Sequence, residues 1–218
     1  MEQDEWKLRP DDIEAKSFAI IDSEAGAHGW EPKSWAVVRR LIHTSADFDY
    51  IKDVVISPGA IDSGIKAIVG GAHIITDTKM ALSGINLRRV GLANQLICLI
   101  DSPATKLKAQ ETGLTRAMAA VDLALAHEID HRGAIWAFGN APTALLRLLE
   151  CLDKDSSLPI PHLVVGVPVG FVNALESKKA LAESKLPHFI TNLSRKGGSN
   201  VAAAAINAIT ALAREKSF

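Results

Sequence analysis

The chain has 218 residues and a formal net charge of −1, with 24 basic and 25 acidic side chains. This balance argues against binding to nucleic acid or to an anionic membrane surface, because both partners attract a surplus of basic residues. Hydrophobic residues make up 48% of the chain but aromatic residues only 5%, which favours helices packed on a buried aliphatic sheet over a surface that stacks nucleic-acid bases.

The cysteines and the start of the chain indicate a cytoplasmic protein. Cys98 and Cys151 are the two cysteines, and apolar neighbours surround each of them, so we expect both to be reduced. The first residues are acidic and lack the apolar segment of a signal peptide. No apolar run reaches the roughly 20 residues of a membrane span. The length fits one domain over residues 1–218.

The first part of the chain mixes helical and strand patterns. Apolar spacing near 3.6 residues predicts helices over residues 12–25, 32–43, 60–69, 78–82 and 114–131. Pro32 is a typical first-turn residue of the second helix, and Gly133 ends the last one. Short apolar runs predict strands over residues 51–56, 72–75 and 95–100.

The C-terminal part repeats one arrangement three times: an apolar strand, a loop of small residues and a helix. The strands are predicted over residues 134–138, 162–167 and 189–193, and the helices over residues 143–152, 171–183 and 200–213. Continuous apolar strands that alternate with helices are typical of parallel strands buried on both faces. We therefore expect an α/β fold, a three-layer, doubly wound, mostly parallel sheet with helices on both faces.

Three loops follow these strands, at residues 139–142, 168–170 and 195–199. Ligands of such sheets bind beyond the carboxyl ends of the strands, where free N–H groups at helix starts favour anions. Arg195 and Lys196 add positive charge, and Ser199 can cap its helix. One such loop alone is an ordinary tight strand end, whereas three together favour a polyanionic ligand. None matches a P-loop or a Rossmann fingerprint.

A basic segment in the second helix carries a titratable group. Val38, Leu41 and Ile42 share the predicted buried stripe, while Arg40 and His43 share the opposite face. Neighbouring arginines favour the neutral imidazole and a helix C-terminus favours the cation, so the charge of His43 stays open. From the spacing alone, a solvated helix face is the interpretation that we favour.

A second histidine pattern indicates an alternative. His127, Glu128 and His131 fit the H-E-x-x-H arrangement of zinc enzymes, with Glu150 as a candidate third ligand. The segment also resembles the HEIDH segment of peptide deformylases, but Cys98 does not have the spacing of that family. The same residues fit the solvated end of a helix, and we favour that interpretation.

Several segments together resemble one family. They are residues 14–21, 39–43, 139–145 (GNAPTAL), 166–172 (GVPVGFV), 176–178 and 197–199, the last before an Ala-rich helix. In order and spacing they are similar to the precorrin-8X methylmutases, from about residue 13 to residue 213.

The resemblance implies an isomerase of corrin biosynthesis that moves a methyl group from C-11 to C-12 of a tetrapyrrole. It would convert precorrin-8X to hydrogenobyrinate, or cobalt-precorrin-8 to cobyrinate. The resemblance also implies a homodimer that needs no cofactor and no metal. The matching His43 is the expected proton donor, and Ser17, Arg40 and Arg116 are the expected substrate-binding residues. The alternatives are a zinc-dependent hydrolase built on residues 127–131 and Glu150, and a non-catalytic corrinoid carrier.

Overall fold

The computed structural model describes residues 9–86, 94–128 and 133–215. Within these ranges, six strands form one sheet in the order β1-β6-β5-β4-β2-β3. The strands are β1 Val54–Ile56, β2 Ile74–Thr76, β3 Leu96–Ile97, β4 Ile135–Phe138, β5 Leu163–Gly166 and β6 Phe189–Asn192. All neighbours are parallel except β1, which pairs antiparallel with β6 at the edge. The predicted mostly parallel α/β sheet is confirmed.

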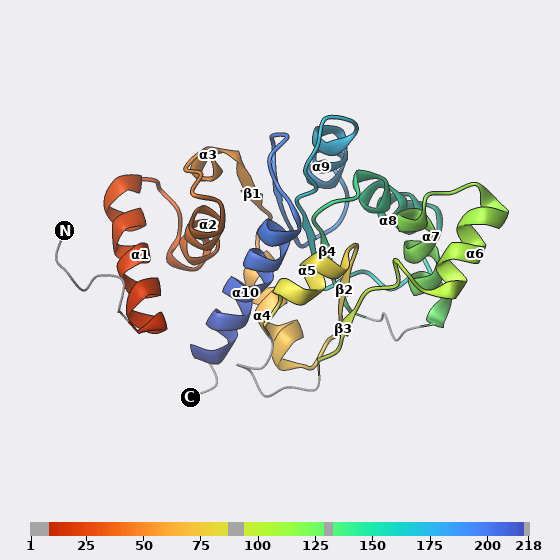
Figure 1. Ribbon diagram of the computed structural model, residues 1–218, viewed down its shortest axis with the longest axis horizontal. Helices are drawn as coiled ribbons and strands as arrows, with labels where there is room; N and C mark the ends of the chain where they lie inside the picture. The colour runs from red at the N-terminus through yellow and green to blue at the C-terminus, as the bar shows by residue number, and fades with distance from the viewer. Residues whose placement is uncertain (1–8, 87–93, 129–132, 216–218) are drawn as a thin grey trace.

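Helices cover both faces of the sheet. They are α1 Pro10–Ala25, α2 Pro32–Ser45, α3 Tyr50–Asp53, α4 Ala60–Val69, α5 Lys79–Gly84, α6 Pro103–Thr112, α7 Arg116–Leu123, α8 Pro142–Lys154, α9 Ala174–Ala182 and α10 Ser199–Glu215. Helices α2, α4 and α10 share one hydrophobic cluster, and α7, α8 and α9 share the other. Helix α1 lies outside α2, at one end of the molecule in Figure 1.

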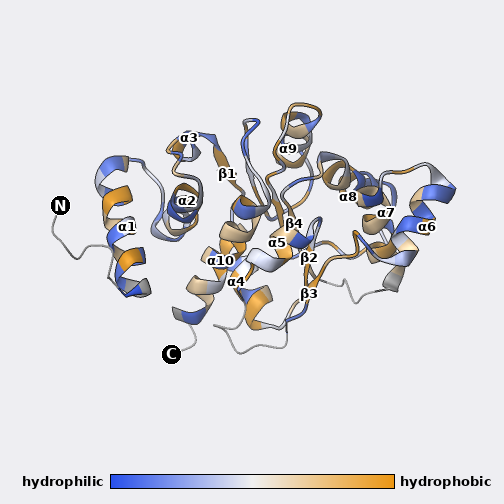
Figure 2. Ribbon diagram, viewed as in Figure 1, coloured by the Kyte–Doolittle hydropathy of each residue, from blue (hydrophilic) through white to orange (hydrophobic). Residues whose placement is uncertain are grey.

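The central strands show why three layers form. In β4, Ile135 and Ala137 belong to the first cluster, whereas Trp136 and Phe138 belong to the second. Successive strand residues point to opposite faces, so an uninterrupted apolar strand needs an apolar layer on each side. Figure 2 accordingly shows α10, which lies against the sheet, as largely hydrophobic and the outer helix α6 as largely hydrophilic.

Helix α10 is the centre of the first cluster. Its small residues 202–205 are buried, and it packs against α2, α4 and α5. A Cβ atom added at Gly84 of α5 would lie 2.8 Å from the Cβ of Ala203, so the two helices approach more closely than larger side chains allow. The Ala-rich pattern therefore serves packing inside the chain.

Two predicted elements differ from the structure. Residues 51–56 do not form one strand, because the chain makes the helical turn α3 first and β1 starts at Val54. That turn buries Tyr50 and redirects the chain from α2 to the edge of the sheet. The long helix predicted over residues 114–131 is also shorter: α7 begins at Arg116, capped by Thr115, and continues as a π-helical turn over Ala124–Glu128. Residues 129–132 lie outside the described ranges.

Two further differences concern a helix that was missed and a helix that starts later than predicted. Helix α6, Pro103–Thr112, was not predicted from the sequence. Helix α9 begins at Ala174 and not at residue 171, because Asn173 adopts a left-handed conformation with φ of 59°. Phe171 and Val172 before it are 83% and 79% exposed. They belong to the loop beyond β5 instead of a helix face.

Candidate functional site

The site begins with His43 in the last turn of α2. Val37, Val38, Leu41 and Ile42 are buried, as predicted, and hold that helix against α10. His43 is half-buried on the opposite face, toward α1. Its Nδ1 lies 2.9 Å from the Oγ of Ser17, so the hydroxyl of α1 fixes the plane of the imidazole ring. Among the described residues, no hydrogen bond to Nε2 is found.

Phe18 closes the other side of the imidazole. Its ring meets that of His43 edge-on, with 5.3 Å between ring centroids. The guanidinium carbons of Arg39 and Arg40 lie 4.3 and 4.7 Å from the centre of the Phe18 ring. One aromatic ring therefore orients both the titratable group and the two cations through edge-to-face and cation–π contacts.

Arg40 has a partner of its own on α1. Its Nη1 and Nη2 donate to the two carboxylate oxygens of Glu14 at 2.8 and 2.9 Å, and the arginine side chain is only 18% exposed. Such a bidentate pair is among the stronger charge-assisted contacts. A substrate carboxylate that binds Arg40 therefore has to share the guanidinium with Glu14 or displace it.

A cavity opens beside Arg40 between four helices. It has a volume of about 280 Å³ and is lined by Glu14, Arg40, Gly84, Asn86, Asn207, Thr210, Ala211 and Arg214. Pockets that enclose drug-sized ligands measure roughly 300–1,000 Å³. This cavity is therefore large enough for one peripheral group of a macrocycle but not for the ring.

The carboxylate of Asp77, which directly follows β2, holds the backbone of the loop after β4. The carboxylate accepts the backbone N–H groups of Gly139, Asn140 and Ala141 at 3.1, 2.7 and 2.7 Å. Burial raises the pKa of Asp77, and these three donors offset part of that effect. The expected free N–H groups of this loop are thus already occupied, and the sequence analysis missed Asp77.

The other two loops bind each other. The N–H of Gly198 donates to Val167 O at 3.0 Å, and the N–H of Gly170 donates to Arg195 O at 3.2 Å. A Cβ at Gly197 would lie 2.1 Å from the Val167 oxygen, so only glycine fits there. These loops are closely packed to one another, and the backbone N–H groups of Gly170 and Gly198 are engaged between them.

The basic residues of the last loop are also engaged. Lys196 forms ion pairs with Asp47, at 2.7 Å, and with Asp49, which follow α2. The Arg195 guanidinium lies 5.6 Å from the centre of the Phe171 ring. Ser199 does not cap α10 but hydrogen-bonds Thr78, the cap of α5, with 2.8 Å between the oxygens. The basic residues of this loop therefore do not form an open cation cluster. The loop connects the end of α2 and the start of α5 to the sheet.

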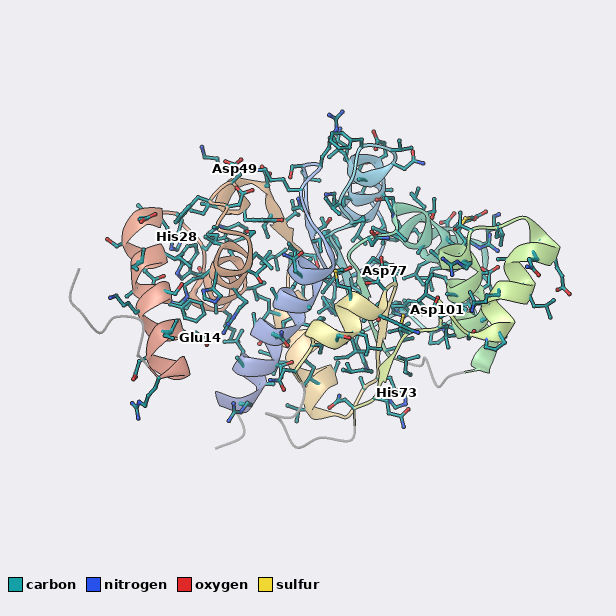
Figure 3. All side chains as sticks on the ribbon, viewed as in Figure 1. Glu14, His28, Asp49, His73, Asp77 and Asp101 are labelled. Atoms are coloured by element: carbon teal, nitrogen blue, oxygen red, sulfur yellow. The ribbon has the colours of Figure 1, made fainter. Side chains whose placement is uncertain are left out.

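Arg116 lies apart from this group. It is the first residue of α7, 56% exposed, and its Nη1 lies 3.3 Å from a carboxylate oxygen of Asp101. Figure 3 shows Asp101 and Glu14 on opposite sides of α10. Within one chain the structure thus brings Ser17, Arg40 and His43 together and leaves Arg116 across the molecule.

The zinc alternative finds no support. Among the described residues, no group of three His, Cys, Asp or Glu side chains is arranged to hold a metal ion. Glu150 accepts hydrogen bonds from Arg147, at 2.9 Å, and from Lys154. His131 lies outside the described ranges, and the side chains of His127 and Glu128 are not described either.

Fold and site together define an α/β protein with a half-buried imidazole that is held by a serine hydroxyl beside two arginines. The family profile described as precorrin-8X methylmutase matches residues 12–212. The chain is 44% identical to the cobalt-precorrin-8 methylmutase of Salmonella typhimurium over 213 residues, which cover 95% of this chain and 97% of that relative. It is 39% identical to the precorrin-8X methylmutase of Pseudomonas aeruginosa over 199 residues, or 90% and 93% of the two chains.

A solved structure agrees. The crystal structure of precorrin-8x methyl mutase from Thermus thermophilus superposes with a TM-score of 0.87 at 43% identity, covering 94% of this chain and 97% of that one. The chain belongs to the precorrin-8X methylmutase family, and its activity is that of an isomerase. The resemblance seen in the sequence is confirmed. The zinc-hydrolase and carrier alternatives are set aside.

Proposed function

We propose that this isomerase moves a methyl group from C-11 to C-12 of a precorrin-8 macrocycle, with His43 as the proton donor. In its cationic form, His43 donates its Nδ1 proton to the Oγ of Ser17, 2.9 Å away, and presents its Nε2 proton to the ring. Protonation withdraws electron density from the conjugated system. The bond from C-11 to the methyl carbon then breaks as the bond to C-12 forms, and the proton returns to His43.

One observation carries this proposal. His43 has one ring nitrogen held by Ser17, while no described residue hydrogen-bonds the other. A general acid needs this combination, because its direction must be fixed and its reacting proton must remain available. The reaction changes no oxidation state and needs no leaving group, so a positioned acid and a binding surface suffice.

We propose that Arg40 binds a peripheral carboxylate of the substrate in exchange with Glu14. The cavity beside it, with Arg214 and Asn86 in its lining, fits one acidic side chain of the ring. Charge-assisted hydrogen bonds to a carboxylate contribute about 1.5–3 kcal/mol each. Arg116 is proposed to meet a different carboxylate, since it lies on the other side of α10.

We further propose a cytoplasmic homodimer with one domain per chain. Exposed apolar side chains support the association: on α1, Ile13 and Ile20 are 49% and 48% exposed, and Phe171 and Val172 extend from the loop beyond β5. Cys98 and Cys151 are free thiols, as expected in a reducing compartment. Of the helices in the described ranges, none combines the length and hydropathy that a bilayer crossing requires.

The absorption spectrum of the substrate tests the function. Purified protein is mixed separately with precorrin-8X and with cobalt-precorrin-8, and the spectrum is followed over time. Conversion of at least one of them to the spectrum of its methyl-shifted product is the expected result. Unchanged spectra with both substrates would contradict the proposal.

A further inference from the structure

Lys178 is a charged side chain in the interior. It lies in α9 and is 0% exposed. Its ammonium donates to the backbone oxygen of Lys196 at 2.6 Å and lies 3.4 Å from Oδ1 of Asn192. Both acceptors are neutral, and no described carboxylate lies within ion-pair distance of it. Lys178 is therefore a buried cation whose hydrogen bonds within the described residues go to carbonyl oxygens.

Burying an ammonium group in this way destabilises the fold. An ammonium taken out of water loses its hydration, and neutral acceptors replace only part of it. Burial lowers the pKa of Lys178 to about 8, against a smaller opposite effect of Asp53. An unbranched apolar side chain would occupy the same space at lower cost. The stability of the fold therefore does not account for a charged side chain at this position, and its surroundings have to.

The charge lies at the base of the loop that reaches α2. The backbone oxygen of Lys196 accepts hydrogen bonds from Lys178 and, at 3.0 Å, from Nδ2 of Asn192. The side chain of the same Lys196 forms ion pairs with Asp47 and Asp49. These aspartates directly follow α2, and Figure 3 shows Asp49 above that helix. His43 lies in the last turn of α2.

We propose that Lys178 is a positioning residue for the methyl shift. Its buried ammonium fixes the backbone of Lys196, so that the side chain of Lys196 holds the end of α2 and thereby the direction of His43. This inference rests on the proposed role of His43. It adds a residue that does not touch the substrate and acts through another.

Three aspartates act on the connection that runs from Lys178 through Lys196 to the end of α2. Asp53 acts on the Lys178 ammonium, and Asp47 and Asp49 face Lys196. Tyr50 is buried and interacts with the charges of Asp47 and Asp53, and burial raises its pKa to about 12, so it stays neutral over the useful pH range. Above pH 8, Lys178 loses its proton and one of its donors, and turnover is expected to fall there.

The test uses the Lys178→Met variant, with Lys179→Met as the control. Lys179 is the next residue in α9 but is exposed. Turnover and KM are measured for both variants between pH 6.5 and 9.5. For Lys178→Met we expect kcat to fall about tenfold, less than the roughly hundredfold cost of a 1 Å misplacement, with KM unchanged. We also expect the decrease of kcat near pH 8 to disappear.

A double variant tests whether Lys178 acts on α2 through Lys196. If Lys178 acts through Lys196, combining Lys178→Met with Lys196→Met lowers kcat no further than either change alone. Multiplying effects would overturn the proposal, as would a Lys178→Met enzyme that behaves like the control or keeps the decrease near pH 8. Melting temperatures verify that each variant is folded.

A readout without substrate separates this inference from the proposed function. Amide hydrogen exchange over residues 43–49 is expected to be faster in Lys178→Met than in Lys179→Met at pH 7. Equal exchange would overturn the positional link. Failure of the wild type to convert either corrinoid would contradict the proposed function but would leave this exchange result unaffected.

Discussion

The helix pair α1–α2 and the loops at the carboxyl edge of the sheet both gather polar side chains, but they use them differently. In the loops, Asp77 accepts three backbone N–H groups and Lys196 pairs with two aspartates. In the helix pair, His43 binds Ser17 through Nδ1, and no described residue hydrogen-bonds its Nε2. Satisfied polar groups make a framework, whereas chemistry needs a group that is held and still available.

Removal of His43 tests the reactive side of this comparison. His43→Ala is expected to lower kcat by about 10²–10⁴, the usual contribution of a positioned general acid. Substrate affinity is expected to persist, because Arg40 and the cavity remain. Steady-state turnover and equilibrium binding of the corrinoid check both statements. His28→Ala is the control, since that ring stacks on Trp35 away from the Ser17–His43 pair.

Removal of Asp77 tests the framework side. Asp77→Ala leaves three backbone donors without their acceptor, which is expected to lower the free energy of unfolding by about 3 kcal/mol. Urea denaturation measures the change, and Asp101→Ala is the control, because the Asp101 side chain is 42% exposed. A change in Asp77→Ala as small as that of the control would show that the loop does not depend on this carboxylate.

Lys178 predicts a pH dependence of stability. Its pKa is about 8 in the folded protein, below the ordinary value of 10.5. Between these values the unfolded chain holds the extra proton, so this contribution to stability is complete above pH 10.5 and is lost as the pH falls through 8. The free energy of unfolding should gain about 3 kcal/mol from this group over that window.

Urea denaturation of Lys178→Met and wild type at pH 7.5 and 10 measures the difference. The variant should lack this gain and should be no less stable than wild type at pH 7.5. Identical pH dependence in the two proteins would refute the assignment of a depressed pKa to the buried ammonium.

Ser17 should have a smaller effect than His43. Ser17→Ala removes the hydrogen bond to Nδ1, and the loss of a hydrogen bond to a charged group is expected to lower kcat about tenfold. Ser17→Thr keeps the hydroxyl and should retain most of the activity. If Ser17→Ala has wild-type kcat, the hydroxyl does not orient the imidazole.

The smallest effect is expected outside both regions. Glu150 serves as a partner of Arg147 and Lys154 on the surface of α8. Glu150→Gln should therefore leave turnover unchanged, and so should treatment of the wild type with a metal chelator. Loss of activity in either experiment would revive the zinc hypothesis and would weaken the assignment of the chemistry to the α1–α2 helix pair.

Much of the fold was predictable because its signals are local. Helix α4 has the predicted bounds, and the three C-terminal units alternate as expected. Helix α6 was missed although Ser102 caps it, Pro103 begins it and Gly113 ends it. Thr105 is its buried residue, so no apolar stripe marks it in the sequence. Periodicity finds helices that face a core and overlooks those that face solvent.

The site was predictable in part. The resemblance named Ser17, Arg40 and His43, and the structure brings them together. Glu14 as the partner of Arg40 was not predicted, nor was the pairing of Lys196 with Asp47, which lies 149 positions away in the sequence. Contacts of this range depend on the docking of whole elements, and residue spacing carries no signal of them.

Chemical rescue tests the central claim most directly. His43→Ala leaves space beside Ser17, and imidazole added to the solution can occupy it as a proton donor. The account predicts that conversion of the bound corrinoid by this variant rises with imidazole concentration, while His28→Ala shows no such dependence. Conversion by His43→Ala at the wild-type rate without imidazole would contradict the account.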